Sequence, residues 1–215
     1  MHCVGFAPRK PVREVHRGND LKGSFSMRLI EFAAHEYDAA MPTAKPGPAL
    51  LTAEVDTPIG PILVATDSDS VVLLAFQNAD WESAVDSVEA KLGAEAKPAS
   101  QRLLNRTTLE LDEYFAGLRT NFSVPVSFGD AAGYRLSVLQ LTANIPYGET
   151  RSYGDVAAAA GNSKAVRAAG TSVGLNPVPI IVPCHRVVRS DGSIGKFSGG
   201  SETKRLLLEH EANNA

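Results

Sequence analysis

The most constraining feature of the sequence is a proline-punctuated run at residues 177–188, which reads PVPIIVPCHRVV. Each of its three prolines removes a backbone hydrogen-bond donor and fixes one φ angle at about −65°. Such a segment cannot form the interior of a helix or a central strand, so it predicts a rigid turn. That turn holds Cys184, which is one of only two cysteines in the chain; the other is Cys3.

A cysteine in this setting has two interpretations. A free thiol has a pKa of about 8.5, and nearby cations lower it and make the sulfur reactive. His185 and Arg186 follow Cys184 directly, but neighbouring side chains of an extended chain point to opposite sides. Contact with His185 therefore requires a bend in the backbone or a bridging water. The other interpretation is a small buried hydrophobic residue, and the residue types alone favour neither.

The charge is distributed unevenly along the chain. Residues 51–133 carry five Lys or Arg and 13 Asp or Glu, whereas residues 134–215 carry nine and six. Residues 151–189 carry five basic residues and one acidic residue, and such a locally basic segment in an acidic protein indicates a polyanionic partner. Charge alone is explained more simply by a solvated surface, so this signal needs support from a motif.

Several classes of protein are disfavoured by the sequence. No apolar run reaches the ~20 residues that span a membrane, and the N-terminus has no signal-peptide pattern, so we expect a cytoplasmic protein without a membrane partner. Residues 1–48 are expected to form a poorly ordered extension and linker, because residues 41–48 are rich in Pro and Gly. The histidines and the cysteine of this extension match no compact zinc pattern, and we expect neither a metal nor a cofactor.

Residues 49–131 have the pattern of an α/β domain. Short runs rich in Val, Ile and Leu predict strands, and apolar residues at helical spacing predict helices. The expected strands are 51–56, 60–66, 70–77 and 122–128, and the expected helices are 81–92 and 100–116. The domain contains no nucleotide-binding loop and no paired catalytic carboxylates, so we interpret it as a scaffold.

Residues 132–215 are expected to be mainly helical. An apolar helix at 134–145 precedes two short helices at 152–160 and 164–173, which predict a helix-turn-helix. Ser152 and Asp155 have the spacing of a capping box, and Ser163 is expected to cap the second helix. Lys164 and Arg167 are then expected to share one face of that helix. Its small residues, 165 and 168–170, suit close approach to a narrow groove.

The signature around Cys184 extends along the chain. Its further parts are IPYGET at 145–150, SYG at 152–154, residues 164–170, Asn176, DGS at 191–193, SGG at 198–200 and LLEHE at 207–211. With these parts, residues of about 50–211 resemble the methylated-DNA–protein-cysteine methyltransferases, or O6-alkylguanine-DNA alkyltransferases. The resemblance implies a ribonuclease H-like α/β N-terminal domain and a mainly α, winged-helix-like C-terminal domain with a helix-turn-helix.

The resemblance also implies a function in DNA repair. A member of this family binds double-stranded DNA that contains O6-alkylguanine, with its second short helix in the minor groove, and flips the damaged base out. The alkyl group moves to the cysteine irreversibly, so each molecule acts once. O4-alkylthymine is a further candidate substrate, and we expect the protein to act as a monomer.

Roles for individual residues follow from the same resemblance. Cys184 is the alkyl acceptor, His185 takes its proton through a water, and Glu211 polarises His185. The other residues implied near the reacting base are Tyr153, Asn176, Val187, Phe197 and Ser198. The residues implied at the DNA are Ser163, Lys164, Arg167, Tyr153 and Arg186.

Three of these roles are specific. Tyr153 donates a proton to the guanine ring, Asn176 braces the turn, and Arg167 replaces the flipped base in the stack. The carbonyls of Cys184 and Val187 are implied to read the exocyclic amine, and the backbone of Ser198 to contact O6. Phe197 stands where relatives often carry Tyr, so no role of that hydroxyl is carried over.

The sequence leaves two other functions open. A non-catalytic protein that binds alkylated DNA on the same scaffold would not need Cys184. A cysteine hydrolase of an unrelated kind would need turnover, and no oxyanion arrangement can be argued from these residues.

Overall fold

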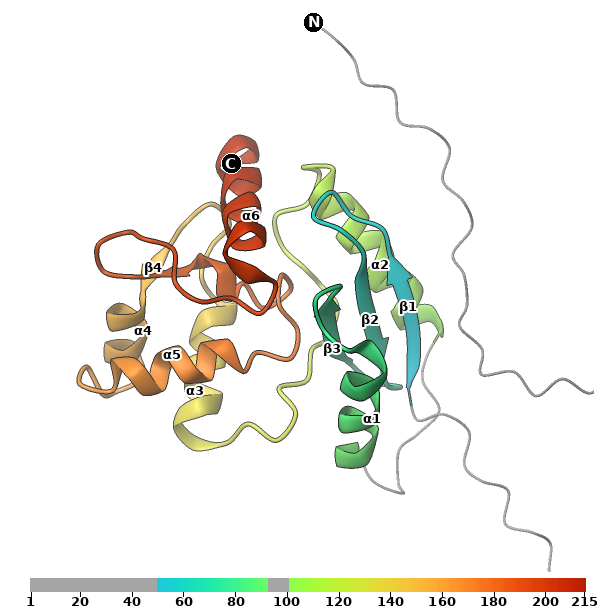
Figure 1. Ribbon diagram of the computed structural model, residues 1–215, viewed down its shortest axis with the longest axis horizontal. Helices are drawn as coiled ribbons and strands as arrows, with labels where there is room; N and C mark the ends of the chain where they lie inside the picture. Colours follow the sequence, from blue (N-terminus) through green and yellow to red (C-terminus); the bar gives the residue numbers. More distant parts are fainter. Residues whose placement is uncertain (1–49, 93–100) are drawn as a thin grey trace, which may run out of the picture.

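The computed structural model describes residues 50–92 and 101–215, which fold into two domains side by side (Figure 1). The expectations for residues 1–48 lie outside the described residues. These are the poorly ordered extension and linker and the absence of a zinc site there. No helix among the described residues is both long enough and apolar enough to cross a membrane.

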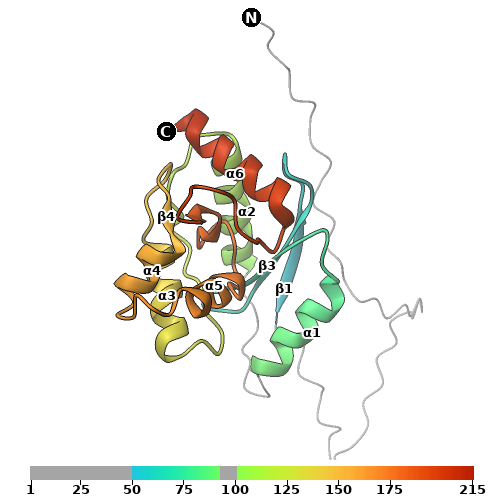
Figure 2. The same ribbon diagram turned by 60° about the vertical axis from the view of Figure 1, so that its left-hand side comes forward.

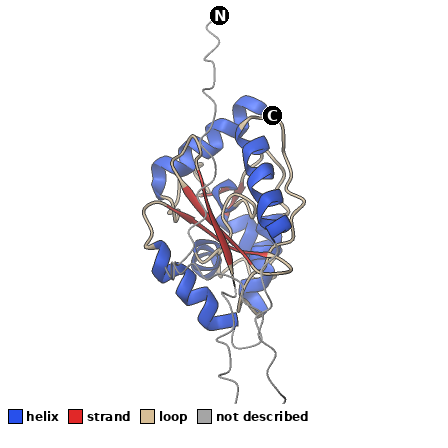
Figure 3. Ribbon diagram, turned by 90° about the vertical axis from the view of Figure 1, so that its right-hand side faces the viewer, coloured by secondary structure: helices blue, strands red, loops and turns tan. Residues whose placement is uncertain are grey.

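The N-terminal domain is built on a three-stranded antiparallel sheet. Its strands are β1 (Leu51–Val55), β2 (Ile62–Thr66) and β3 (Val71–Phe76), in that order. All five residues of the central strand β2 are buried, as expected for a strand covered on both faces. The sheet contacts two helices, α1 (Trp81–Leu92) and α2 (Gln101–Phe115). Figure 3 shows the strands enclosed by helices.

The strand expected at 122–128 is wrong. The segment forms one isolated bridge, between Val126 and Val71, beside the edge of β3. Val71 N–H donates to the carbonyl of Pro125, and Ser127 N–H donates to the carbonyl of Val71. Pro125 has no N–H of its own, so the ladder cannot continue through it.

The C-terminal domain contains mostly short elements. They are α3 (Gly133–Ala143), β4 (Arg151–Ser152), α4 (Tyr153–Ala159), α5 (Val166–Gly174), a 3-10 turn η1 (Cys184–Arg186), β5 (Val187–Val188) and α6 (Gly200–Asn214). Strands β4 and β5 pair in parallel, with Arg151 opposite Val187. This pairing fixes the start of α4 beside the segment that follows Cys184.

The start of α4 agrees with the prediction, whereas the start of α5 does not. Ser152 caps α4, and its reciprocal bonds with Asp155 complete the capping box. Helix α5 begins only at Val166, and no side chain caps it. Lys164 N–H instead donates to the Asn162 side chain at 3.2 Å. The expected Ser163 cap, and a shared helical face for Lys164 and Arg167, are therefore wrong.

The small residues of α5 serve packing more than close approach to a partner. Ala169 is fully buried between the helices, and a side chain at Gly170 would contact the Tyr153 ring. Only Ala168 is exposed among residues 168–170. The exposed residues of α5 are Val166, Arg167, Ala168, Thr171 and Gly174, so small residues form only part of its outer face.

Helix α6 lies at the boundary of the two domains, next to α2 in two views (Figures 1 and 2). A side chain at Gly117, just after α2, would collide with Asn214 near the end of α6. The inner face of α6 carries three buried residues, Lys204, Leu207 and Glu211. Helix α6 therefore brings polar groups into the junction between the domains.

Candidate active site

The run at 177–183 forms the tight turn that its prolines predict. Ile180 has a φ angle of 75°, a left-handed conformation that is unusual for a β-branched residue. Asn176 spans the turn, because its side-chain amide donates to the Val182 carbonyl at 2.8 Å and its oxygen accepts from Val178 N–H at 3.1 Å. Leu74 N–H of β3 donates to the Pro177 carbonyl at 2.9 Å, so the N-terminal domain also holds this turn.

Cys184 begins the 3-10 turn η1 and is only 3% exposed. Burial raises the pKa of its thiol, while a hydrogen bond with Asn176 and the charge of Lys204 act in the opposite direction. Because burial dominates, the thiol needs a group that accepts its proton. A buried thiol next to a suitable base is a candidate nucleophile.

His185 is the candidate base. Its ring is fully buried, and Nε2 lies 2.7 Å from Glu211 Oε1. A carboxylate can only accept hydrogen bonds, so Nε2 carries the hydrogen and Nδ1 is left as the acceptor. Nδ1 is buried and has no hydrogen-bond partner among the described residues. Burial lowers the pKa of His185, with Glu211 opposing it, so the ring is neutral and able to take a proton.

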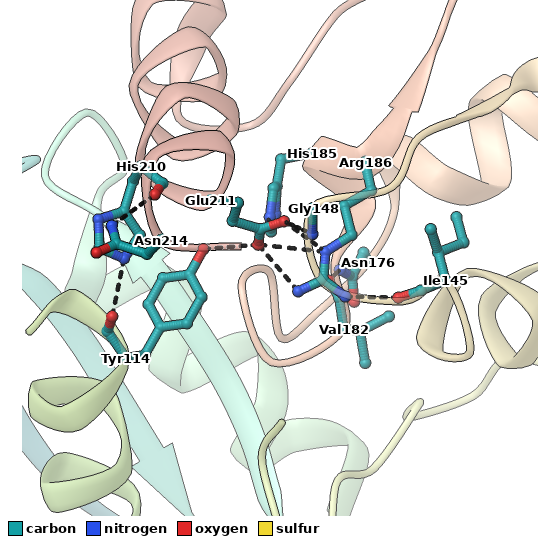
Figure 4. A network of polar contacts seen from close by, with 10 residues as sticks. All are labelled: Tyr114, Ile145, Gly148, Asn176, Val182, His185, Arg186, His210, Glu211 and Asn214. Carbon is teal, nitrogen blue, oxygen red and sulfur yellow. Dashed lines mark hydrogen bonds and ion pairs between the residues drawn. The ribbon is translucent and has the colours of Figure 1, made fainter. Parts of the chain in front are cut away.

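Glu211 is the centre of a buried polar network (Figure 4). Besides His185, it accepts from Arg186, from Tyr114 at 2.8 Å and from Gly148 N–H at 3.1 Å. Burial alone would raise the pKa of this carboxyl, but the hydrogen bonds from His185 and Arg186 outweigh it and lower the pKa to about 2. The Glu211 carboxyl is therefore negatively charged at neutral pH.

The expectation that Arg186 contacts DNA is not supported by this network. Arg186 is 5% exposed, and its guanidinium donates to Glu211 and to the Ile145 carbonyl. A buried carboxylate needs a paired cation, and Arg186 is the only arginine with which Glu211 pairs among the described residues. Arg186 is thus a structural counter-charge inside the domain.

A flap at residues 195–199 lies beside His185. The Phe197 ring is 6.5 Å from the His185 ring and 5.3 Å from the Phe76 ring of β3. The Ser198 carbonyl accepts from Asn78 at 2.9 Å, whereas no described residue accepts from Ser198 N–H. That N–H is free to contact a ligand, and the N-terminal domain anchors the flap.

Tyr153 supports the other end of the flap. A side chain at Gly195 would collide with the Tyr153 ring and hydroxyl. The ring also packs on the apolar cluster that contains Cys184. Burial raises the pKa of Tyr153, so its hydroxyl stays protonated and can donate a hydrogen bond.

The carbonyls of Cys184 and Val187 are expected to accept a hydrogen bond from the exocyclic amine of guanine. Each of them accepts one hydrogen bond within the protein. The Cys184 carbonyl accepts from Val187 N–H, and the Val187 carbonyl accepts from the ammonium of Lys204. A carbonyl oxygen has two lone pairs, so each retains one for a ligand. Lys204 is fully buried, and burial lowers its pKa to about 8.

Three of the five residues expected at the DNA take no part in this network. Ser163, Lys164 and Arg167 are all exposed, in the turn before α5 and in its first turn. The side chains of Lys164 and Arg167 make no hydrogen bond or ion pair with any described residue. Two apolar side chains of α5 and its end, Val166 and Leu175, are 39% and 55% exposed.

Comparison with known proteins decides the family. The family model described as the ribonuclease-like domain of 6-O-methylguanine DNA methyltransferase matches residues 50–128, and the one described as its DNA binding domain matches residues 133–213. A constitutive methylated-DNA–protein-cysteine methyltransferase of Bacillus subtilis is 39% identical over 73% of this chain and 92% of its own length. The chain belongs to the 6-O-methylguanine DNA methyltransferase family.

Other members of the 6-O-methylguanine DNA methyltransferase family agree in sequence and in structure. The Mycobacterium leprae methylated-DNA–protein-cysteine methyltransferase is 37% identical over 73% of this chain and 89% of its own length. The Mycobacterium tuberculosis OGT solved in complex with DNA superposes with a TM-score of 0.63 at 33% identity, over 75% of this chain and 92% of that one. The two-domain architecture expected from the sequence is thereby confirmed.

Two residues of the site, Lys204 and Tyr114, were not predicted from the sequence. Lys204 lies three and seven residues before Leu207 and Glu211, a helical spacing that places all three on one buried face of α6. That periodicity was a usable signal. Tyr114 lies 97 residues before Glu211, to which it donates. No local pattern could have joined them. Among the described residues, no cluster of His, Cys, Asp or Glu could hold a metal.

Proposed function

We propose that this protein repairs alkylated DNA by transferring the alkyl group from O6 of guanine in double-stranded DNA to Cys184. The observation that carries the proposal is the buried series Cys184, His185 and Glu211, with Nδ1 of His185 left without a partner. In a chain of this family, that series provides a nucleophile, a base and a group that orients the base.

The proposed step balances without a cofactor. The thiol proton of Cys184 passes through a water to His185 Nδ1, while Glu211 holds Nε2. The sulfur then attacks the alkyl carbon in line, so an S–C bond forms as the C–O6 bond of the base breaks. The electron pair of that bond stays on guanine, which takes up one proton, and the protein retains a thioether. A thioether is not reversed by thiol exchange, so each molecule reacts once.

Tyr153 is proposed as the proton donor to the departing guanine. Its raised pKa keeps the hydroxyl protonated, and its ring packs on the cluster that contains Cys184. The pocket is proposed to consist of the carbonyls of Cys184 and Val187, the free N–H of Ser198 and the ring of Phe197. Asn176 is proposed to keep the turn before Cys184 in shape.

Binding to the duplex is assigned to the turn before α5 and to its first turn. Lys164 and Ser163 are proposed to contact the backbone phosphates, and Arg167 to enter the stack in place of the extruded base. Extrusion costs a few kcal/mol and costs least for a damaged base. An exposed arginine without a partner among the described residues, such as Arg167, is suited to this task.

The remaining proposals concern the organisation of the protein. We propose an N-terminal extension at 1–48, a supporting domain at 49–131 and a DNA-binding and acceptor domain at 132–215. The protein is proposed to act as a cytoplasmic monomer and to need no cofactor, and O4-alkylthymine in DNA is proposed as a second substrate.

The test is a mass measurement on protein mixed with a duplex that contains one O6-methylguanine. We expect one methyl group per protein molecule, located on the peptide that contains Cys184, and guanine restored in the DNA. A protein that binds the duplex without forming an adduct would instead be a non-catalytic lesion-binding protein. Repeated turnover by one protein molecule would indicate an enzyme of another kind.

A further inference from the structure

One donor to the Glu211 carboxylate comes from the other domain. Tyr114 lies on α2, is fully buried, and donates its hydroxyl hydrogen to Glu211 Oε1 at 2.8 Å (Figure 4). The other donors to Glu211 among the described residues, His185, Arg186 and Gly148, all belong to the C-terminal domain. The N-terminal domain therefore reaches the group that orients His185.

The Tyr114 ring is fixed in place on several sides. Ring centroids of Tyr147, Phe122 and His210 lie 6.0, 5.5 and 5.1 Å from that of Tyr114. His210 Nε2 also lies 2.8 Å from the Tyr114 carbonyl, which ties α6 to α2. A ring held in this way directs its hydroxyl to one place, so the carboxylate cannot turn without losing the bond.

The Tyr114 hydroxyl shares its acceptor with the proposed base. Glu211 Oε1 accepts from both Tyr114 at 2.8 Å and His185 Nε2 at 2.7 Å. Two donors that converge on one oxygen constrain its position and divide its negative charge between them. Removing the Tyr114 donor leaves more of that charge for His185.

We propose that Tyr114 is a positioning residue for alkyl transfer, through which the N-terminal domain fixes the Glu211 carboxylate that orients His185. The inference rests on the proposed function and extends it, because the N-terminal domain then takes part in the acceptor site and is more than a scaffold. Tyr114 itself touches neither Cys184 nor the base in this account.

Loss of the Tyr114 hydroxyl should change the pH dependence of alkyl transfer. The titratable and charged groups that face Glu211 and His185 are Tyr114 of α2, Tyr147 of the loop after α3, Cys184 and Arg186 of η1, and Lys204 of α6. Burial lowers the pKa of His185 and Glu211 opposes this. Without the Tyr114 hydroxyl, Glu211 attracts the imidazolium more strongly, so the pKa of His185 rises. Since a protonated His185 cannot accept the thiol proton, the acid limb of the rate profile moves to higher pH.

The experiment compares Tyr114→Phe with Tyr147→Phe in the full-length chain. Tyr147 is a matched control, because its ring belongs to the same cluster and its buried hydroxyl has no hydrogen-bond partner among the described residues. The rate constant of Cys184 alkylation is measured with free O6-benzylguanine and with an O6-methylguanine duplex, across the range in which histidine titrates. Tyr114→Phe is expected to lower it roughly tenfold near neutral pH, and more at lower pH. Tyr147→Phe is expected to follow the unmodified protein.

The outcomes separate this inference from the function on which it rests. If the unmodified protein forms no adduct, the proposed function fails. If it reacts and Tyr114→Phe has the same rates and the same pH profile, or loses activity only in proportion to folded protein, Tyr114 is not a positioning residue. Should Tyr114→Phe not fold, Tyr114→3-fluorotyrosine keeps the ring and makes the hydroxyl a stronger donor. It is expected to move the acid limb to lower pH, and an unchanged limb would overturn the inference.

Discussion

The acceptor site and the surface of α5 are built in opposite ways. At the acceptor site, Cys184, His185, Arg186 and Glu211 are each at most 5% exposed, and the polar side chains bond to one another. Around the start of α5, Lys164 and Arg167 are exposed and make no such bonds with the described residues. The first arrangement is suited to controlling one reaction, whereas the second leaves cations without bonds to the described residues and so available to a partner.

This contrast has a physical origin. A buried charge must be paired, because leaving it unpaired costs several kcal/mol, and a paired charge is not available to a ligand. A surface cation contributes little to the fold and can be used entirely for binding. Substitutions at the acceptor site should therefore affect the reaction and stability, whereas substitutions on the surface of α5 should affect DNA binding.

The largest effect is expected from Cys184→Ser. The hydroxyl is a much weaker nucleophile than the thiol, so no alkylated protein should form, by mass spectrometry, within the time in which the unmodified protein reacts completely. Binding to an O6-methylguanine duplex should be unchanged, because the Cys184 side chain is buried and forms no part of the exposed surface of α5. Residual transfer at the original rate would place the acceptor at another residue.

Glu211→Gln should be the most destabilising conservative change. It leaves the buried Arg186 without its counter-charge, which costs roughly 3–5 kcal/mol when a buried pair is broken. Urea denaturation followed by circular dichroism measures the change in unfolding free energy. Glu202→Gln on the same helix is the control: its ion pair with Arg205 is exposed, and no measurable change is expected.

The lowered pKa of Glu211 predicts that the folded protein loses stability in acid. The folded pKa of Glu211 is lowered to about 2, below the value of about 4.3 in an unfolded chain. Its contribution to stability is thus fully present above the unfolded value and is lost as the pH falls through the folded one. A plot of unfolding free energy against pH should be flatter below pH ~4 for Glu211→Gln. Parallel curves for the two proteins would contradict this assignment.

Arg167→Ala should have a smaller effect, confined to DNA. Without the inserted side chain, the extruded state loses a stacking partner, so repair of an O6-methylguanine duplex should slow by roughly tenfold, as for the loss of one stacked contact. Stopped-flow measurement of adduct formation at subsaturating DNA tests this. Stability should not change, since the side chain has no partner in the described part of the protein.

The smallest effect is expected from Lys164→Ala. A single phosphate contact should weaken binding by severalfold and lower the slope of log affinity against log salt by about one. Fluorescence anisotropy at several salt concentrations measures both quantities. An unchanged slope would remove Lys164 from the DNA-binding surface.

The sequence was most informative where the pattern is local. The prolines at 177–183 predicted the turn, and the Ser152 capping box predicted the start of α4, because each depends on residues close in the chain. The predicted start of α5 is wrong for a related reason. Ser163 has the chemistry of a cap, but the chain turns at Asn162 and the helix begins only at Val166.

Long-range contacts account for what could not be predicted. From the sequence, Arg186 is predicted to be a cation at the DNA. Only the fold shows that its guanidinium donates to Glu211 and to the Ile145 carbonyl. Tyr114 is one of the buried residues of α2, and its hydroxyl gains a role only when α6 packs against that helix. Neither contact follows from composition or periodicity.

One measurement tests the division between the two regions most directly. The rate constant of Cys184 alkylation is determined for Arg167→Ala and for His185→Gln, each with free O6-benzylguanine and with an O6-methylguanine duplex. Our account predicts that Arg167→Ala loses rate only on the duplex, whereas His185→Gln loses a similar factor on both substrates. Equal losses on both substrates for Arg167→Ala would show that α5 and the acceptor site are not separate in function, and would contradict the account.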